Sequence, residues 1–421
     1  MSDRRPSLGP LQDGARVIIL GGGPAGVACS LRLYRRAQSA GRNLTVTIIE
    51  SKDMPGGGHY NQCIGVLSPP LPTLLTQDLN IDFPYHLARN EIREYVLHGS
   101  RNQLSLPDEV SPSLALRRVQ FDAYMMEQAK QRCASVVLAR AMDLEFHASG
   151  VLVYTESQPV EGDVVVGAFG LDEGTASLFA RRTNYRRPRA MSSVVTKYHP
   201  GEEAMAAFGP RIHAFLPSDV HIEFGSVTSK GDHLAINIAG RDVNARRLEA
   251  FLRDDTVRAV LPNLDRAGQI KSDDLQFYKG RFPISRAKNY FGDRYVMVGD
   301  AAGLVRAFKG KGVTSAVQTG IRAADAMFDV GISQRAFESG YHTVNMDILR
   351  DLPYARAMRL AVIVMARTGV MDAVIRAAAH DPRLRGALLG AVSGHEPYKR
   401  VWRDSLAPSS AAAVPRQLFS P

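Results

Sequence analysis

The chain has 421 residues, of which 45% are hydrophobic and 22% charged, a balance that suits a globular protein with a large core. Its net charge is +10, but no helix-turn-helix, zinc-finger or RNP-like motif accompanies that charge, so we expect no nucleic-acid partner. Three cysteines at unrelated spacings fit neither a disulfide framework nor a zinc site, and we predict no metal. The polar first 14 residues resemble no signal peptide, and no apolar run reaches membrane length, so we expect a cytoplasmic location.

The first predicted element is a buried strand at residues 17–20, followed directly by a glycine-rich turn and a helix. The glycines have G-x-G-x-x-G spacing: the first permits a tight turn, the second lets a pyrophosphate approach the backbone, and the third lets helix and strand pack closely. The phosphates would then face the free N–H groups of the helix start. The predicted contacts in this stretch are Gly21, Gly23, Pro24, Ala25 and Gly26.

A second strand at residues 44–49 ends in Glu50, about where an acidic side chain would accept hydrogen bonds from a ribose. The alternative is an ordinary strand–turn–helix with a surface glutamate. The order of strand, glycines, helix, strand and acid favours a bound dinucleotide.

The rest of the chain predicts more strands, then an antiparallel sheet, then helices. Before residue 190 we expect a strand end followed by a helix over residues 114–130, and strands at 136–146, 151–156 and 164–166. The antiparallel strands are expected at 192–197, 213–216, 221–227 and 233–239. An amphipathic helix at 246–260, a buried strand at 294–298, a long helix at 313–330 and further helices to residue 403 complete the prediction.

Two later segments indicate that the dinucleotide carries a flavin. Gly299-Asp300-Ala-Ala-Gly303 joins a buried strand to a helix, where an aspartate can bind a ribityl hydroxyl and a helix N-terminus can face phosphate or the flavin's N1–C2=O edge. Arg118-Val-Gln-Phe-Asp122 offers a guanidinium suited to phosphate or to the flavin's polar edge. The sequence therefore predicts FAD.

With these segments in view, the sequence resembles the geranylgeranyl reductase family, within the FAD enzymes that share the para-hydroxybenzoate hydroxylase architecture. The family's G-x-G-P-A-G, R-x-x-F-D and G-D-A-A-G motifs match residues 21–26, 118–122 and 299–303. A following G-x-G helix start matches Gly310 and Gly312, with Val313 next. A cysteine-containing segment resembles residues 63–68, and an aromatic-x-x-F-P strand resembles residues 213–217.

The resemblance implies an α/β fold: a Rossmann-like FAD-binding domain interrupted by an antiparallel β-sheet substrate domain, with a C-terminal helical region. We expect the FAD-binding domain at 14–189, with interleaved substrate-domain strands, and again at 285–332. The substrate sheet is expected at 190–284 and the helical region at 333–421.

The resemblance also implies residue roles. FAD contacts are expected at the glycine turn, Glu50, Arg118, Gly299, Asp300, Gly303, Gly310, Gly312 and Val313. Substrate contacts are expected at His213, Phe215 and Pro217. Catalytic candidates are Cys63, His59 and Tyr60, although the cysteine could equally be a small apolar filler and the histidine a surface residue.

One departure bears on the electron donor. The family usually has A-D-G where this chain has Ala168-Phe169-Gly170, and loss of that aspartate argues mildly against a standard NADPH-dependent hydroxylase. Two lysines at 309 and 311 add positive charge beside the expected flavin, where they could stabilise reduced flavin or simply be solvated.

These observations predict an FAD-dependent oxidoreductase that moves a hydride between flavin and a C=C bond of a hydrophobic, isoprenoid-like substrate. Because no second G-x-G-x-x-G unit is present, electrons would come from transient NAD(P)H or from a redox partner protein such as a ferredoxin. The alternatives are an FAD monooxygenase acting on a specialised metabolite and a non-catalytic, FAD-stabilised lipid carrier. The apolar stretch at 358–375 is expected to be packed core, with peripheral membrane contact as the second interpretation.

Overall fold

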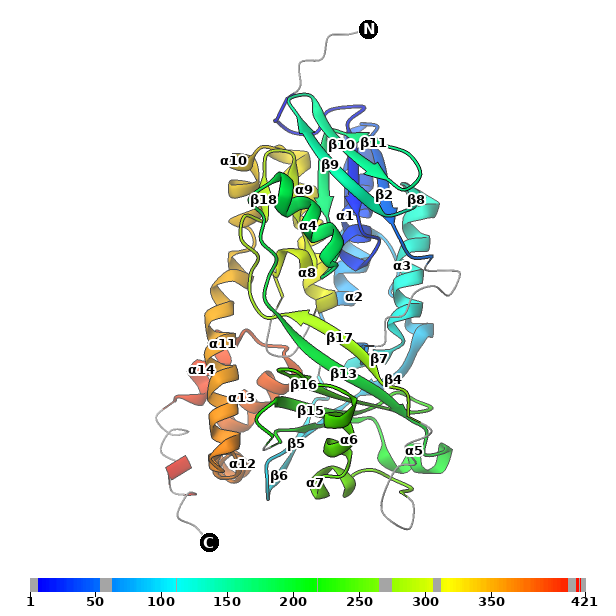
Figure 1. The fold of residues 1–421 in the computed structure, drawn as a ribbon. Helices are drawn as coiled ribbons and strands as arrows, with labels where there is room; N and C mark the ends of the chain where they lie inside the picture. Colours follow the sequence, from blue (N-terminus) through cyan, green and yellow to red (C-terminus); the bar gives the residue numbers. More distant parts are fainter. Residues whose placement is uncertain are drawn as a thin grey trace.

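Two large sheets organise the fold, one in each half of the molecule (Figure 1). The computed structural model describes residues 7–53, 63–110, 112–217, 219–264, 275–305, 312–407, 414, 415 and 417. Strands β13 and β17 run from the middle of the molecule into the lower sheet, and the long helix α11 lies along one side of both halves (Figure 1).

The upper sheet has six strands, and its strands are parallel except for the short antiparallel pair at one edge. Its order is β18 (Phe291–Gly292), β19 (Tyr295–Met297), β12 (Val164–Gly167), β1 (Arg16–Leu20), β2 (Thr45–Glu50) and β8 (Ala134–Leu138). The last four residues of β1 are apolar and buried, as expected of a parallel strand covered on both faces. The predicted strand–turn–helix–strand order is confirmed.

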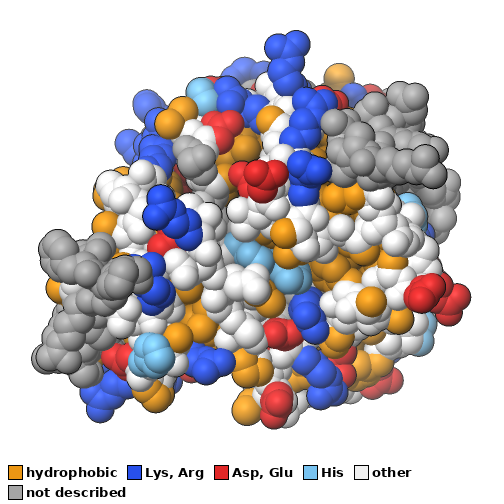
Figure 2. Space-filling view, turned by 90° about the horizontal axis from the view of Figure 1, so that it is seen from below, with side chains coloured by type: hydrophobic (Ala, Val, Ile, Leu, Met, Phe, Trp, Pro, Cys, Tyr) orange, Lys and Arg blue, Asp and Glu red, His pale blue; other side chains and the backbone are white. Residues whose placement is uncertain are grey.

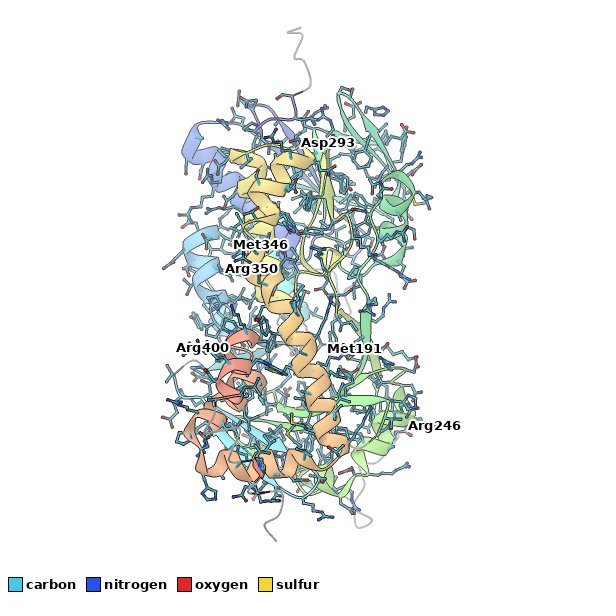
Figure 3. All side chains as sticks on the ribbon, turned by 90° about the vertical axis from the view of Figure 1, so that its left-hand side faces the viewer. Met191, Arg246, Asp293, Met346, Arg350 and Arg400 are labelled. Atoms are coloured by element: carbon cyan, nitrogen blue, oxygen red, sulfur yellow. The ribbon has the colours of Figure 1, made fainter. Side chains whose placement is uncertain are left out.

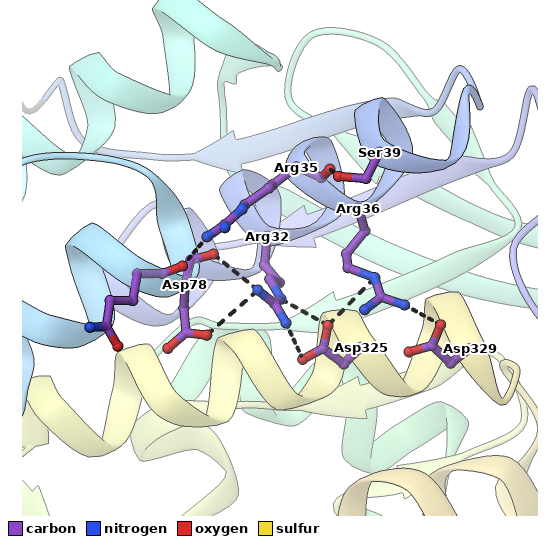
Figure 4. Close-up of polar contacts among 8 residues, drawn as sticks. Arg32, Arg35, Arg36, Ser39, Asp78, Asp325 and Asp329 are labelled. Atoms are coloured by element: carbon purple, nitrogen blue, oxygen red, sulfur yellow. Dashed lines mark hydrogen bonds and ion pairs between the residues drawn. The ribbon is translucent and has the colours of Figure 1, made fainter.

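Two helices, α1 (Pro24–Ala40) and α9 (Gly312–Asp329), pack against each other beside this sheet. Figure 4 shows the polar contacts along their seam. Arg32 donates to both carboxylate oxygens of Asp325, at 2.8 and 3.1 Å, and Arg36 pairs with Asp329. These contacts join segments almost 300 residues apart. They hold the helix that follows the glycine turn against the helix that follows Asp300.

A small antiparallel sheet lies above the parallel one, with the order β11 (Val160–Gly162), β10 (Gly150–Thr155) and β9 (Ala141–His147). The predicted strand at 136–146 is therefore wrong as a single element, because it divides between β8 and β9 in two different sheets. Nearby helices are α3 (Arg118–Arg132) and α4 (Glu173–Arg182).

The lower sheet has seven strands, in the order β17 (Tyr278–Pro283), β13 (Ala190–Tyr198), β16 (Leu234–Gly240), β15 (Ile222–Ser229), β14 (Arg211–Phe215), β5 (Glu94–His98) and β6 (Gln103–Pro107). The four predicted antiparallel strands are confirmed as β13 to β16. Strand β5 was not predicted, and it pairs with β14 in parallel, the one parallel step in this sheet.

A fourth, short sheet has the order β3 (Val66–Leu67), β7 (Ser113–Leu116) and β4 (Ala88–Ile92). Three short helical segments lie between β3 and β4 in the chain: α2 (Leu71–Thr73), the π-helical η1 (Leu74–Asp78) and the 3₁₀-helical η2 (Tyr85–Leu87).

One face of the seven-stranded sheet is covered by α5 (Glu202–Phe208), α6 (Ala245–Leu252) and α7 (Asp255–Arg258), whose apolar side chains share one core with the strands. The single helix predicted at 246–260 is wrong in extent, because the structure has two shorter helices there, α6 and α7. Asp254 lies in extended conformation between the two helices, and its carboxylate accepts the amide of Thr256 at 2.9 Å, which caps a new helix start.

The chain ends in helices, as predicted: α8 (Gly299–Ala302) precedes α9, and the others are α10 (Gln334–Phe337), the π-helical η4 (Glu338–His342), α11 (Met346–Arg367), α12 (Val370–His380), α13 (Pro382–Ser393) and α14 (Tyr398–Ser405). Helices α12 and α13 pack on β5 and β6 in a second core. Within the described residues, no helix combines the length and the apolar character that a membrane crossing requires.

The surface over the seven-stranded sheet carries mixed charge. Seen from below, Lys and Arg side chains are dispersed among acidic and apolar ones on this face (Figure 2). This view gives no support to a nucleic-acid-binding face there, because such faces gather their basic residues.

Candidate functional site

A cleft of about 1030 Å³ lies at the carboxyl ends of the central parallel strands, where α/β sheets bind their ligands. Its lining comes from the ends of β1 and β2, from the turn after β12, from the starts of α1 and α9, and from parts of β9, α3, α4 and α8. Its volume is at the upper end of the range for small-molecule sites, which suits a dinucleotide. Most of the predicted FAD contacts line it: Gly21, Gly23, Pro24, Ala25, Glu50, Arg118, Asp300, Gly312 and Val313.

The glycine turn at the start of α1 has the geometry predicted from its spacing. Gly21 has φ +111°, and a Cβ there would lie 2.4 Å from the carbonyl oxygen of Ala168. A Cβ on Gly26 would lie 2.1 Å from the oxygen of Gly21, so this glycine lets helix and strand meet. A Cβ on Gly23 would meet nothing within 4 Å, because this residue faces the cleft. The open space above Gly23 is where a pyrophosphate fits.

Helix α1 presents an anion-binding end to that space. Gly23 is its N-cap residue, Pro24 follows in the first turn, and among the described residues no side chain caps the helix. The first backbone N–H groups and the positive end of the helix dipole are thus available to phosphate.

Glu50 lies at the end of β2 and lines the cleft. Its carboxylate accepts the amide of Gly22 at 2.8 Å and that of Lys52 at 2.9 Å. These two bonds fix the carboxylate at the cleft edge, the position predicted for a ribose contact.

Arg118 and Asp300 lie farther along the cleft. The guanidinium of Arg118 donates to both carboxylate oxygens of Asp122, at 2.8 and 3.1 Å. Burial works against its charge, but Asp122 holds the pKa of Arg118 above its usual range. Burial raises the pKa of Asp300 to about 6, against the opposing effect of Arg118. Its carboxyl can therefore exchange hydrogen bonds with a ribityl chain in either protonation state.

The residues around Asp300 need unusual backbone geometry. Gly299 and Gly303 have φ +58° and +65°, and a Cβ on Gly303 would lie 2.2 Å from the carbonyl oxygen of Ser285. The amide of Gly299 donates to the hydroxyl of Thr319 at 2.9 Å, which ties this turn to α9. The cleft thus fits FAD along the part of the chain that the structure describes.

Cys63 is exposed and lies beside the cleft arginine: Nη1 of Arg118 donates toward its sulfur at 3.9 Å. A second cation, Lys230, interacts electrostatically with this thiol. Lys230 is only 3% exposed, and its Nζ lies 3.2 Å from where a Cβ on Gly65 would be. Burial lowers the pKa of Lys230 to about 8. The predicted catalytic thiol is thus flanked by two cationic side chains.

Two other functional candidates were not predicted as such. Lys230 lies in a hairpin turn, and no local signal distinguishes a buried lysine there from an exposed one. Phe169 lies against Phe179 at a ring-centroid distance of 5.6 Å and edge-on to Tyr185, and it lines the FAD cleft. Its signal was the departure from A-D-G at this position.

The remaining predicted site residues are placed as follows. His59, Tyr60 and Gly310 lie outside the described residues. His213 is buried, its Nδ1 lies 2.8 Å from Nε2 of His98, and burial lowers its pKa to about 3. Phe215 lines a small apolar pocket, and Pro217 follows β14 half-buried. Substrate contact by these three residues stays a prediction.

His199, Asp232 and His233 bring one ligand atom each to within 4.8 Å of one another. We assign no metal to this cluster. Arg117 lies 3.6 Å from the carboxylate of Asp232, and Lys230 is adjacent, so the surrounding charge opposes a bound cation.

Comparisons with known proteins agree with the motifs. An FAD-NAD(P)-binding family model matches residues 18–172. A chloroplastic geranylgeranyl diphosphate reductase of Nicotiana tabacum is 24% identical over 336 residues, which cover 75% of this chain and 66% of that relative, slightly less than two thirds of its length.

Solved structures show the same fold. A geranylgeranyl bacteriochlorophyll reductase-like protein of Thermoplasma acidophilum superposes with a TM-score of 0.70 at 15% identity, over 94% of this chain and 99% of that one. A flavoprotein/dehydrogenase of Cytophaga hutchinsonii gives 0.69 at 15% identity, over 96% and 99%.

Proposed function

We propose that this chain, a geranylgeranyl reductase-like flavoprotein with an FAD-binding domain, is a reductase that saturates a C=C bond of a hydrophobic, isoprenoid-like substrate. The observation that supports it best is the position of Cys63 beside the arginine of the FAD cleft. Saturation of a C=C bond needs a hydride for one carbon and a proton for the other. FAD, when bound, supplies the hydride.

The protein's own residues supply the proton in this proposal. The Cys63 thiol gives its proton to the second carbon and becomes a thiolate. Arg118 donates toward that sulfur and Lys230 interacts with it electrostatically, so both cations stabilise the new negative charge. Solvent then reprotonates the exposed sulfur.

An apolar pocket supports a hydrophobic substrate. It lies between the seven-stranded sheet and the helices α11 to α13, and its lining is apolar except for Glu223 and Arg359, which form an ion pair. Its volume is about 50 Å³, enough for a short part of an apolar chain. Phe215, a predicted substrate contact, is among its lining residues.

The experiment starts from FAD-loaded protein reduced by dithionite without oxygen. Addition of geranylgeraniol should reoxidise the flavin, and the lipid should gain the mass of two hydrogens per saturated bond, both of them deuterium in D₂O because the hydrogens on reduced flavin N5 and on the thiol exchange with solvent. Cys63→Ala should keep FAD but slow this step by about 100-fold or more, the usual contribution of a general acid. Cys133→Ser is the control, because that cysteine lies at the end of α3 and bonds to Ser30 and Ala129.

Three results would contradict the proposal or part of it. Reoxidation by oxygen alone, coupled to conversion of another small molecule, would instead indicate the monooxygenase alternative. Bound flavin that neither donor nor lipid affects would indicate a non-catalytic carrier. Unchanged rates in Cys63→Ala would remove the thiol from the mechanism.

A further inference from the structure

A buried lysine that lacks a hydrogen-bond acceptor lies beside Cys63. Lys230 follows strand β15 in the hairpin that leads to β16, and it is only 3% exposed. Its ammonium group makes no hydrogen bond or ion pair with any residue that the structure describes. Buried charges in proteins are normally paired, so an unpaired one points to a missing partner.

Lys230 belongs to the inner face of the seven-stranded sheet, which is turned toward the FAD-binding half. On β15, Val227 packs into the core under α5 to α7, so the alternating residues Thr228 and Lys230 face the other way. The backbone amide of Lys230 donates to the carbonyl oxygen of His233 at 2.9 Å, which continues the hairpin pairing beyond the strand. Figure 3 shows both sides of the sheet: Met191 on β13 lies toward the middle of the molecule, whereas Arg246 on α6 lies at the outer edge of the lower half.

The segment that carries Cys63 passes close to this lysine. Gly65 has φ +66°, and a Cβ on it would lie 2.2 Å from the carbonyl oxygen of Leu116 and 3.2 Å from Nζ of Lys230. A glycine is therefore what lets the ammonium group come so near the segment. The exposed thiol of Cys63 interacts electrostatically with Lys230 and accepts from Arg118, which lines the FAD cleft. The ammonium group and the thiol thus lie together at the side of that cleft.

The surrounding charges do not compensate Lys230. Lys197 and Arg117 are near enough to disfavour its charged form. Asp232 has the opposite effect, but its carboxylate is held by the adjacent histidine at 2.7 Å and lies 3.6 Å from Arg117. The hydroxyl of Thr228, on the same face of the sheet, is also buried without a partner among the residues described. The site has hydrogen-bond donors and lacks an acceptor.

We propose that Lys230 binds a carbonyl oxygen of the substrate, so that the C=C bond that is reduced is conjugated to an aldehyde or ketone group. The inference rests on the proposed function and names its substrate class. A carbonyl oxygen is the acceptor that the ammonium group lacks, and it leaves the ligand uncharged, as the apolar pocket beside the sheet favours.

Conjugation gives the lysine a chemical task. The β-carbon of the substrate accepts a hydride from reduced FAD, which is left oxidised, and the electron pair of the C=C bond moves toward the carbonyl group. The carbonyl oxygen becomes negatively charged, and the ammonium group of Lys230 stabilises it in a buried site. The α-carbon then takes the proton of the Cys63 thiol, and the carbonyl group re-forms. An isolated C=C bond has no oxygen on which this charge can collect.

The first test compares geranylgeranial, an α,β-unsaturated aldehyde, with geranylgeraniol on FAD-loaded protein reduced without oxygen. The aldehyde should reoxidise the flavin about 100-fold faster or more, and Lys230→Met should lower this ratio of rates by about 100-fold, the usual contribution of one donor to a developing oxyanion. The ratio isolates the carbonyl contact, because an effect of Lys230 on the thiol is common to both substrates. Lys279→Met changes an exposed lysine on β17 of the same sheet and should keep the wild-type ratio.

The second test uses the wild-type chain, so it does not depend on the folding of a variant. Citronellal is an aldehyde without a conjugated C=C bond, and sodium cyanoborohydride reduces the imine that an aldehyde forms with an uncharged lysine. At pH 8 about half of Lys230 is uncharged, because burial lowers its pKa to about 8. Peptide mass spectrometry of the FAD-loaded protein should therefore find the adduct on Lys230 before it appears on Lys279.

Three outcomes would overturn the assignment of Lys230: an aldehyde that reacts no faster than the alcohol, a rate ratio that Lys230→Met leaves unchanged, or adducts spread evenly over the exposed lysines. Failure of the proposed function has a different signature. If geranylgeraniol reoxidises the flavin as fast as the aldehyde, the reductase stands and this inference fails. If neither lipid reoxidises it, the reductase fails, and the substrate class named here fails with it.

Discussion

Two glycines three residues apart should respond in opposite ways to an added side chain. A Cβ on Gly23 meets nothing within 4 Å, whereas a Cβ on Gly26 lies 2.1 Å from the carbonyl oxygen of Gly21. Gly23 has φ −71° and ψ 177°, a conformation open to any residue. Gly23→Val should therefore fold normally and fail to bind FAD, while Gly26→Ala should be destabilised before any cofactor is added.

The magnitudes follow from these contacts. Gly23→Val should leave the free energy of unfolding within about 0.5 kcal/mol of wild type or raise it slightly, since loss of a glycine restricts the unfolded chain. Two methyl groups in the phosphate space would displace at least one charge-assisted hydrogen bond, about 1.5–3 kcal/mol each, and add steric repulsion, so FAD affinity should fall by about 100-fold or more. In Gly26→Ala the new contact is 1.3 Å short of an ordinary 3.4 Å (3.4 less 2.1), and overpacking of this kind costs about 1–3 kcal/mol.

Urea denaturation of the FAD-free proteins measures the first quantity, and titration of FAD followed by flavin fluorescence measures the second. Wild-type FAD affinity in Gly23→Val would refute the placement of the pyrophosphate over this turn. Equal stability losses in the two variants would refute the argument that one glycine faces a ligand and the other faces the protein.

Three further predictions concern stability. Burial raises the pKa of Asp300 to about 6, so the FAD-free fold binds an extra proton between about pH 4 and 6 and loses stability as pH rises through that window. Asp300→Asn should remove this pH dependence and stabilise the FAD-free protein at pH 7 by roughly 2–3 kcal/mol. An unchanged pH dependence in the variant would contradict the assignment to Asp300. Burial lowers the pKa of Lys230 to about 8, so the unfolded chain binds more protons than the fold between about pH 8 and 10.5. The free energy of unfolding should therefore rise by roughly 3 kcal/mol across that range, and Lys230→Met should abolish the rise. Asp372 accepts the amides of Arg101 and Asn102, both at 2.9 Å, so Asp372→Ala should cost about 2–3 kcal/mol in urea denaturation without loss of FAD, whereas a neutral effect would show that these bonds are replaced by water.

The nucleotide-binding half of the fold could be predicted because its signals are local. An apolar run, three spaced glycines and a terminal acid specify the strand–turn–helix–strand unit ending in Glu50, and each part needs only its neighbours. The second nucleotide segment around Asp300 could be placed beside the first because carboxyl ends of parallel strands meet at one sheet edge.

Pairing across long distances could not be predicted in the same way. Strand β5 joins the seven-stranded sheet through a parallel pairing with β14, more than 100 residues later, and nothing in its own short sequence names that partner. The boundary between β8 and β9 could not be predicted either, because residues 136–146 form one stretch of alternating apolar and polar residues although they contribute to two different sheets. The break at Asp254 was missed because the apolar periodicity continues across it.

The positions of the basic side chains could not be predicted from the sequence either. Composition gives a net charge of +10 but does not say where in the fold the basic side chains gather. In the fold, neighbouring arginines have different environments: Arg182 pairs with Asp143, Arg187 pairs with Glu173, and Arg189 lines a cleft that α11 also lines. Tertiary structure alone brings Arg189 together with Arg356.

The missing aspartate of the A-D-G segment has a structural explanation in the packing around Phe169. Phe169 packs between Phe179 and Tyr185, so a carboxylate at this position would enter an aromatic cluster at a high desolvation cost. The backbone shape is nevertheless kept, since the amide of Ala168 donates to the carbonyl oxygen of Leu20 at 2.8 Å and Gly170 has φ +61°. The segment thus keeps its turn and its place at the edge of the FAD cleft, which Phe169 and Gly170 line. The departure from the family pattern is therefore a change of side chain within a preserved turn.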